Sequence, residues 1–208
     1  MAITTYGELQ AAAANWLVRS DLTARIPEFI GLAEARLNRV LRARLAETEV
    51  ALTATPGSRA IALPAGFTEP LRVWFVRLGQ REELVFREAG LMSAGTVRGE
   101  PRAWGVDGAS LVFDRPCELA YALVLRMLRA FALSDAAPAN GLLSDAPDVY
   151  LFATLCEAAP FLRDGELADA YETKLARAIG ELNAKDARSR AARMLSTDLP
   201  GLVGAVRP

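Results

Sequence analysis

The sequence predicts an α+β fold, mainly α, in which a bundle of four helices carries an inserted antiparallel β meander and an extended C-terminal tail. Three observations support this class. Apolar residues recur at helical spacing in the first 46 residues and again between residues 147 and 190. Between these stretches, short runs rich in Val, Phe, Tyr and Trp alternate with turn sequences. The last stretch, residues 194–208, shows no periodicity, and we expect it to be extended.

Two helices are predicted at the start of the chain, over residues 5–19 and 26–46. Thr5 and Glu8 form a Thr-x-x-Glu capping box for the first helix. Pro27 stands in the first turn of the second helix, where the missing N–H interrupts no helical hydrogen bond. The connection between them is short, so we expect the two helices to pack antiparallel.

A β region is predicted over residues 47–128. Its short apolar runs are separated by residues that favour turns, namely Pro56-Gly57, Gly79-Gln80, Gly99-Glu100-Pro101 and Asp107-Gly108. The Asp107-Gly108 pair is the best hairpin signal, because Asp-Gly adopts the two-residue turns that match strand twist. This spacing predicts an antiparallel meander.

Two further helices are predicted over residues 147–163 and 166–190, after a loop with the sequence SDAAPANGLLSDAP. Pro160 is expected to kink or end the first of them, because proline lacks the N–H that a helix interior requires. We expect residues 1–193 to form a single domain in which the helices from both ends of the chain share one bundle. Leu37 and Leu155 are expected in its core.

The composition argues against a catalytic site. The 208 residues contain no histidine, which excludes Ser-His and Cys-His nucleophile pairs, and no glycine-rich phosphate loop is present. Cys117 and Cys156 lack C-x-x-C spacing, so we expect them to be buried and reduced. Glu157 and Asp164 are seven residues apart, but a solvated charge and a helix-end residue explain them better than an acid–base pair. We therefore predict no catalytic, cofactor or metal site.

Charge and hydropathy limit the partners. A formal charge of −1 predicts no global attraction to nucleic acid or to an anionic membrane. No apolar run approaches the length of a membrane span and no signal peptide opens the chain, so we expect a cytoplasmic protein without a membrane partner.

One arginine series is open to several interpretations. Arg36, Arg39, Arg42 and Arg44 follow one another on the second predicted helix. They are candidates for a face that contacts a neighbouring subunit or lines a channel. The same helix, residues 36–44, is the candidate element of a DNA-binding regulatory protein, since arginines can follow a phosphate backbone. A solvated or salt-bridged helix face is the more usual meaning, because Glu28, Glu34 and Glu47 lie nearby in the sequence.

Five short motifs occur in a fixed order between about Thr4 and Asp164. They are Trp16-Leu17-x-Arg19-x-Asp21-Leu22, Ile26-Pro27-x-Phe29-Ile30, Ala33-Glu34-Ala35-Arg36-Leu37-Asn38-Arg39, Leu63-Pro64-x-x-Phe67 and Glu157-Ala158-Ala159-Pro160-x-Leu162. In these motifs the chain resembles the bacteriophage head-to-tail adaptor, or connector, proteins. It departs from them at Gly141, where such proteins often carry a bulky aromatic residue.

The resemblance implies a structural virion protein of the neck between head and tail, assembled in the host cytoplasm. Twelve copies would form a ring beneath the portal, extend the DNA channel and offer the docking face for the tail. The implied partners are the portal protein, neighbouring copies of the chain, a downstream tail or nozzle protein, and DNA that passes without sequence-specific binding. The apolar residues of the tail are the candidates for docking onto the portal or a neighbouring subunit: Leu195, Leu199, Pro200, Leu202, Val203 and Val206.

Overall fold

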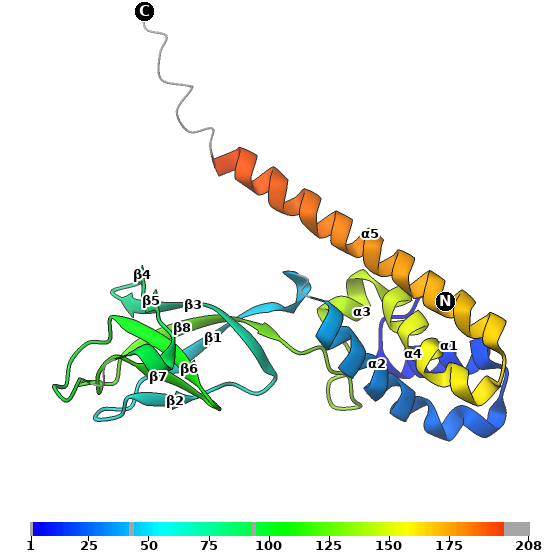
Figure 1. The fold of residues 1–208 in the computed structure, drawn as a ribbon, viewed down its shortest axis with the longest axis horizontal. Helices are drawn as coiled ribbons and strands as arrows, with labels where there is room; N and C mark the ends of the chain where they lie inside the picture. Colours follow the sequence, from blue (N-terminus) through cyan, green and yellow to red (C-terminus); the bar gives the residue numbers. More distant parts are fainter. Residues whose placement is uncertain (1, 42–43, 93–94, 198–208) are drawn as a thin grey trace, which may run out of the picture. The chain divides into compact units, whose positions relative to one another are not determined.

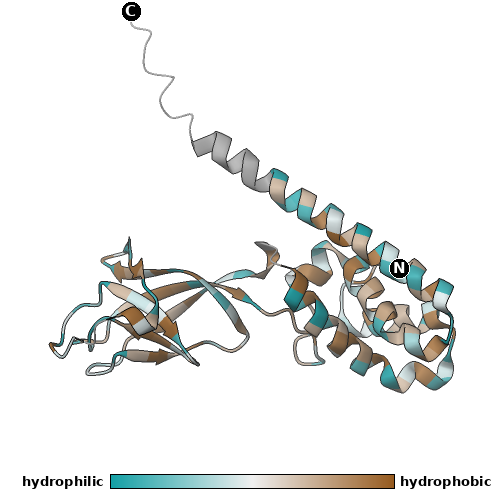
Figure 2. Ribbon diagram, viewed as in Figure 1, coloured by the Kyte–Doolittle hydropathy of each residue, from teal (hydrophilic) through white to brown (hydrophobic). Residues whose placement is uncertain are grey.

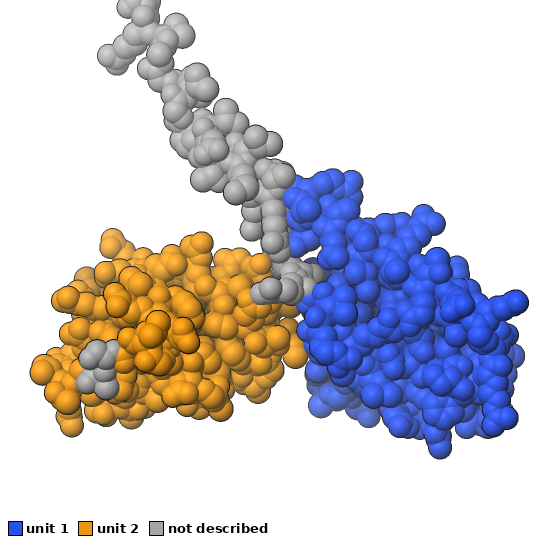
Figure 3. Space-filling view, viewed as in Figure 1, with its two compact units in different colours: residues 1–45, 131–208 blue, residues 46–130 orange. Residues whose placement is uncertain are grey.

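The computed structural model describes residues 2–41, 44–92 and 95–197, with the side chains of Arg44 and of residues 189–197 left out of the description. The chain forms two compact units (Figure 3). Unit 1 comprises Met1–Leu45 and Phe131–Pro208, and unit 2 comprises Ala46–Ala130. The α+β class is confirmed. The span predicted as one domain, residues 1–193, includes unit 2 and all of unit 1 except residues 194–208, and unit 2 overlaps the predicted β region, residues 47–128.

Unit 1 is helical (Figure 1). Its α-helices are α1 (Tyr6–Leu17), α2 (Ile26–Val40), α3 (Gly141–Asp145), α4 (Pro147–Leu162) and α5 (Gly165–Thr197). The predicted capping box at Thr5 is confirmed, since its hydroxyl accepts from the Glu8 N–H and the Glu8 carboxylate accepts from the Thr5 N–H. Pro27 lies in the first turn of α2, as predicted.

The second predicted helix ends earlier than expected, at Val40 instead of residue 46. Leu41 leaves the helix with extended backbone, and its side chain is only 4 % exposed. Burial of this leucine therefore outweighs the helix propensity of the arginine-rich stretch that follows. The connection between α1 and α2 contains a 3-10 helix, η1 (Ser20–Arg25), and a second one, η2 (Arg44–Ala46), precedes the β region.

The predicted loop before α4 contains a short helix, α3, that was not predicted. Asn140 caps it, with its side-chain oxygen accepting from the Leu143 N–H at 2.9 Å. A five-residue helix is too short to show apolar periodicity, so only the cap could have indicated it.

The last helix is longer than predicted, running from Gly165 to Thr197 instead of ending at residue 190. The prediction of an extended tail from residue 194 is therefore wrong for residues 194–197. Alanine and arginine favour helix here, and no proline occurs between Pro160 and Pro200. Residues 198–208 lie outside the described part of the chain.

Helix α4 is the central element of unit 1, because it packs against α1, α2, α3 and α5. From Val149 to Ala159 its side chains are buried, except for the half-buried Phe152 and Glu157, and the helix is mainly hydrophobic (Figure 2). The helix continues through Pro160 and ends two residues later, where Arg163 adopts a left-handed conformation. Leu37 of α2 and Leu155 of α4 are both fully buried, as predicted.

The segment that returns from unit 2 is held to unit 1 by side-chain hydrogen bonds. The Asn38 amide donates to the Phe131 carbonyl at 2.9 Å and accepts from the Phe131 N–H at 2.7 Å. The Tyr150 hydroxyl donates to Glu34 Oε1 at 3.2 Å and accepts from the Asn140 amide at 2.7 Å. These groups satisfy one another in a largely apolar interior, so they fix where the chain re-enters the helical unit.

Unit 2 consists of two four-stranded sheets. Its strands are β1 (Glu47–Thr53), β2 (Ala60–Ala62), β3 (Phe67–Arg77), β4 (Gln80–Glu83), β5 (Val85–Phe86), β6 (Ala103–Asp107), β7 (Ser110–Phe113) and β8 (Ala122–Arg129). The sheet orders are β1-β8-β3-β4 and β2-β7-β6-β5, and β5 and β6 run parallel. The prediction of a simple antiparallel meander is therefore wrong. Strand β4 is polar and exposed throughout, whereas β3, β6, β7 and β8 contribute the apolar side chains that the two sheets bury against each other.

The core of unit 2 draws side chains from both sheets, including Val73, Phe75 and Leu125 of one and Trp104 and Phe113 of the other. The predicted hairpin at Asp107-Gly108 is confirmed, since Asp107 pairs with Ser110 across a turn in which Gly108 has a φ of 54°. The first and last strands, β1 and β8, are antiparallel neighbours, with Glu47 opposite Leu128. The two ends of unit 2 therefore lie side by side.

Candidate interaction surfaces

Arg36 of α2 does not face solvent freely. Its guanidinium donates two hydrogen bonds of 2.7 Å to the two carboxylate oxygens of Glu172 on α5, and Glu157 of α4 lies 3.7 Å away. The hydrogen bonds from Arg36 lower the pKa of Glu172, and those to Glu172 raise the pKa of Arg36. Arg36 therefore joins three helices of unit 1, and its Nη1 and Nη2 groups both already donate to Glu172.

The helix that was predicted to carry the other arginines of the series ends before the last two of them. Arg39 is exposed in the last turn of α2 and forms no ion pair within the part of the chain that the structure describes. Arg44 lies in η2, after the helix has ended, and its side chain is not described. Arg42 lies outside the described residues. The early end of α2 thus breaks the spacing on which this series was predicted.

The predicted docking residues of the tail fall mostly outside the described residues. Leu199, Pro200, Leu202, Val203 and Val206 belong to the stretch 198–208. Leu195 lies in α5, and its side chain is not described. Leu182 is the last residue of α5 known to be buried, and none of the described side chains from residue 183 to 188 is buried. Helix α5 thus continues for fifteen residues past Leu182, to Thr197 (Figure 1).

The outer face of the β1-β8-β3-β4 sheet carries charges of both signs. The ion pairs there are Arg126 with Glu47, Arg72 with Glu83 at 3.1 Å, and Arg81 with Glu49 at 3.0 Å. Arg81 also lies over the ring of Trp74, at 5.3 Å from its centroid. Because each of these arginines has a carboxylate partner, this face offers no concentrated positive charge to a polyanion.

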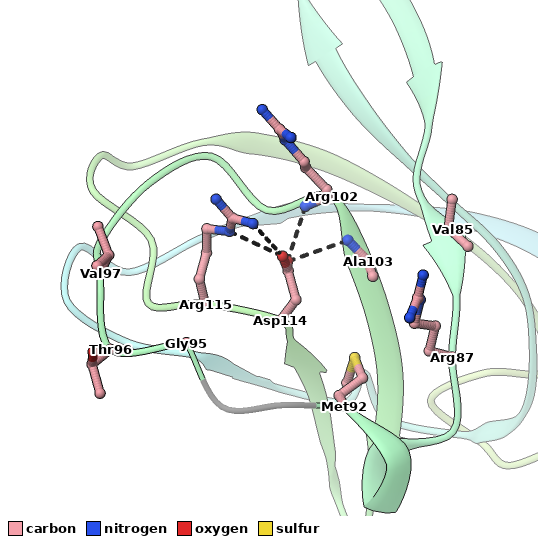
Figure 4. A pocket seen from close by; sticks show the side chains of 10 residues that line it. All are labelled: Val85, Arg87, Met92, Gly95, Thr96, Val97, Arg102, Ala103, Asp114 and Arg115. Atoms are coloured by element: carbon pink, nitrogen blue, oxygen red, sulfur yellow. Dashed lines mark hydrogen bonds and ion pairs between the residues drawn. The ribbon is translucent and has the colours of Figure 1, made fainter.

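A depression of about 720 Å³ lies on the other sheet of unit 2, over β5, β6 and the end of β7 (Figure 4). Asp114 organises it: one carboxylate oxygen accepts from the backbone N–H groups of Arg102 and Ala103, and the other accepts from Arg115. Partial burial acts to raise the pKa of Asp114, but these hydrogen bonds hold it below its ordinary value. Asp114 is thus a structural carboxylate.

Two arginines of this pocket keep their charge unmatched. Arg87, just after β5, and Arg102, just before β6, are exposed and form no ion pair among the described residues. In Figure 4 the guanidinium of Arg102 points away from Asp114. The nearby Glu100 is occupied by an ion pair with Arg77. Val85 and Val97, which are 59 % and 78 % exposed, line the same pocket.

No motif in the sequence predicts this pocket, because Arg87 and Arg102 are fifteen positions apart. The parallel pairing of β5 with β6 brings them together, with Val85 opposite Ala103. Gly105 is a further requirement, since a Cβ at this position would lie 2.4 Å from the Arg87 carbonyl oxygen. A glycine in an apolar strand was the available signal, because it marks a close approach of another backbone.

The residues that first resemble catalytic groups have structural surroundings. Burial, together with the Glu172 carboxylate, raises the pKa of the Cys156 thiol to about 12. Glu157 lies beside Arg36, and Asp164 caps α5 by accepting from the Leu167 N–H at 3.0 Å. Among the residues described, no cluster of three or more His, Cys, Asp or Glu side chains could hold a metal ion. The described helices include none long and apolar enough to cross a membrane.

Comparison with known proteins identifies the family. No curated protein matches the chain. The family model described as SU10 adaptor protein, however, matches residues 4–197, which is most of the chain and includes all five α-helices and both sheets. The resemblance to phage head-to-tail adaptors, drawn above from five motifs, is thereby confirmed. The chain belongs to the SU10 adaptor protein family, a family of phage head-tail adaptors.

Proposed function

We propose that this chain is the ring-forming subunit of a phage neck. In this proposal twelve copies assemble beneath the portal, extend the DNA channel and provide the docking face for the downstream tail or nozzle protein. The family match over residues 4–197 carries the proposal, because it makes the chain a phage structural adaptor. Assembly takes place in the host cytoplasm, and the finished ring lies between head and tail.

The construction of unit 1 supports a role in assembly. Helix α5 runs to Thr197, and Leu182 is its last buried residue among those whose side chains are described. A solvated helical extension gains little stability on its own, because helices in water depend on packing an apolar face. A neighbouring copy or the portal would supply the missing contact. The apolar residues of the tail then dock on that same partner, and many weak contacts in a ring add up through multivalency.

The charge distribution supports a channel that has little electrostatic attraction for the DNA passing through it. The formal net charge of the chain is −1, and the outer face of the β1-β8-β3-β4 sheet pairs its arginines with glutamates. A DNA-binding regulatory protein has less support, because Arg36, the first residue of its candidate helix, is held by Glu172. Arg39, Arg42 and Arg44 are the remaining candidates for a face toward the channel or a neighbouring subunit.

Co-expression with the portal protein tests the proposal. Electron microscopy of the purified complex should show an additional ring below the portal. A chain that ends at Thr197 should keep the melting temperature of the full chain but fail to decorate the portal, because it lacks residues 198–208 and with them five of the six candidate docking residues. A control with serine at Leu78, which is exposed in unit 2, should decorate at full occupancy. Full decoration by the truncated chain, or absence of any ring with the intact chain, contradicts the proposal.

A further inference from the structure

The pocket on unit 2 combines two features that a free surface rarely keeps together. Arg87 and Arg102 present guanidinium groups without a carboxylate partner among the described residues. Val85 and Val97 expose more than half of their surface beside them. An unpaired arginine binds a carboxylate by two parallel hydrogen bonds. The exposed valines favour an apolar side chain at the same place.

The acidic side chains near the pocket already have partners within unit 2, so they do not pair with Arg87 or Arg102. Asp114 is saturated by two backbone N–H groups and by Arg115, whose hydrogen bond measures 2.9 Å. Glu100 is paired with Arg77. The chemistry therefore fits a short extended segment that carries one carboxylate next to apolar side chains.

We propose that this pocket receives residues 198–203 of a second copy of the chain, with the sequence Asp-Leu-Pro-Gly-Leu-Val. Asp198 is the only acidic residue after Asp186, and Leu199 follows it directly. In the bound state, Asp198 pairs with Arg87 and Arg102 while Leu199 contacts Val85 and Val97. Pro200 fixes its own φ and disfavours helix at Leu199, which reduces the entropy lost when the segment binds in an extended form.

The position of the segment favours a second copy as its acceptor. Asp198 follows directly on α5, whose last known buried residue is Leu182. The helix thus delivers the segment beyond the helical core to which it belongs. A contact between the tail of one copy and unit 2 of the next is heterologous, and repeated heterologous contacts close into a ring when the rotation allows it. The contact between tail and pocket is inferred from unit 2 and the tail sequence. Only the ring that such contacts would form rests on the proposed function.

A peptide-binding experiment tests the contact directly. The acceptor is the chain truncated after Thr197, and the probe is a fluorescent peptide spanning residues 196–206. Fluorescence anisotropy should show saturable binding. The variants Arg87→Glu and Arg102→Glu should each weaken it by about tenfold or more, because each replaces an attractive charge pair by a repulsive one.

Matched controls separate the pocket from general charge effects. Arg129→Glu changes another exposed arginine of unit 2, on β8 of the opposite sheet, and should bind the peptide like the unmodified acceptor. A peptide with lysine in place of Asp198 should lose binding to the unmodified acceptor and regain it with the Arg87→Glu, Arg102→Glu double variant. Equal binding by all acceptors, or no rescue by the swapped charges, overturns the proposal.

Self-association of the full chain identifies the acceptor copy. Sedimentation should detect oligomers of the full chain, fewer with Asp198→Lys or with the arginine double variant, and restoration when these two variants are mixed. A monomer whose peptide-binding pocket is already occupied would mean that the tail binds its own copy, which overturns the inference. Failure of peptide binding while the truncated chain still loses portal attachment also overturns it, but leaves the proposed function intact. Absence of a ring on the portal counts against the proposed function itself.

Discussion

The guanidinium of Arg36 and the carboxylate of Glu172 face each other in parallel, with both nitrogen–oxygen distances at 2.7 Å. The two residues lie 136 positions apart in the sequence and connect the second helix to the last. An arginine that the sequence offers as a candidate for DNA or for a neighbouring subunit thus has a partner in its own chain. Its contribution to stability is measurable.

A double-mutant cycle of Arg36→Gln and Glu172→Gln should give a coupling energy of about 0.5–1 kcal/mol. The value is modest because the Glu172 side chain is 49 % exposed and solvent screens the pair. Urea unfolding of the four proteins measures it. The more exposed pair of Arg177 and Glu181, four residues apart on α5, is the matched control and should couple more weakly. Loss of affinity for DNA on Arg36→Gln, at unchanged stability, would revive the DNA-binding interpretation.

Glu34 should make the stability of unit 1 depend on pH. Burial raises its pKa from an ordinary value of 4.5 to about 7, against hydrogen bonds from Tyr150 and from the Leu133 backbone that act to lower it. Folding therefore favours the protonated form. The resulting stabilisation is complete below about pH 4.5 and is lost as the pH rises through about 7.

The Glu34→Gln variant removes this titration. Relative to the unmodified chain, it should gain stability on the order of 1–3 kcal/mol between pH 5 and pH 8, measured by thermal and urea unfolding. Glu28→Gln, an exposed change on the same helix, is the control and should alter the free energy of unfolding by the same amount at pH 5 and at pH 8. A difference between Glu34→Gln and the unmodified chain that stays constant from pH 5 to pH 8 would show that Glu34 does not titrate in this range.

Cys156 should be chemically silent in the folded protein. The residue is only 8 % exposed and burial raises the pKa of its thiol to about 12, so almost no thiolate exists at neutral pH. A thiol reagent should label neither Cys156 nor the buried Cys117 at pH 8, and should label both in denaturant. Cys156→Ala should cost about 1 kcal/mol of stability. Rapid labelling of the native chain would contradict the buried placement.

Unit 1 should fold without unit 2. The two ends of unit 2 lie side by side, and the Cα atoms of Glu47 and Leu128, as opposite residues in an antiparallel pair, are about 5 Å apart. Replacing residues 46–130 by a short Gly/Ser linker should therefore leave the Asn38–Phe131 and Glu34–Tyr150 hydrogen bonds intact. Circular dichroism should show a helical protein with a cooperative thermal transition. A molten or insoluble product would mean that the units depend on each other, as a single domain over residues 1–193 requires.

The local signals in the sequence predicted most elements, and the failures have identifiable physical causes. Thr5, Pro27 and Asp107-Gly108 act through hydrogen bonds and backbone angles within a few residues, so each could be interpreted from the sequence. Helix α2 ends just before Leu41, whose side chain is buried in the folded protein, and burial is a property of the tertiary structure. The pairing of β1 with β8 likewise depends on contacts that no short pattern encodes.

The candidate site was harder to predict from the sequence than the fold. Arg36 looks like a free surface charge until Glu172 is placed opposite it, and nothing in the spacing of the two residues reveals this. Arg87 and Arg102 were not singled out, because only the strand pairing turns two ordinary surface arginines into a pair. Long-range geometry decides both cases, and it is the information that a single sequence carries least directly.

The part of α5 after Lys185, whose ammonium pairs with Asp145 of α3, sets a distance as well as a direction. At a rise of 1.5 Å per residue, the twelve residues from Asp186 to Thr197 act as a ruler of about 18 Å between the helical core and the first residue of the tail. A partner that binds the tail must therefore sit at a fixed separation from the core of the donor copy. Each residue inserted into the ruler would add about 1.5 Å and turn the tail by about 100° around the helix axis. The length of this one helix would then determine the spacing of subunits in the neck.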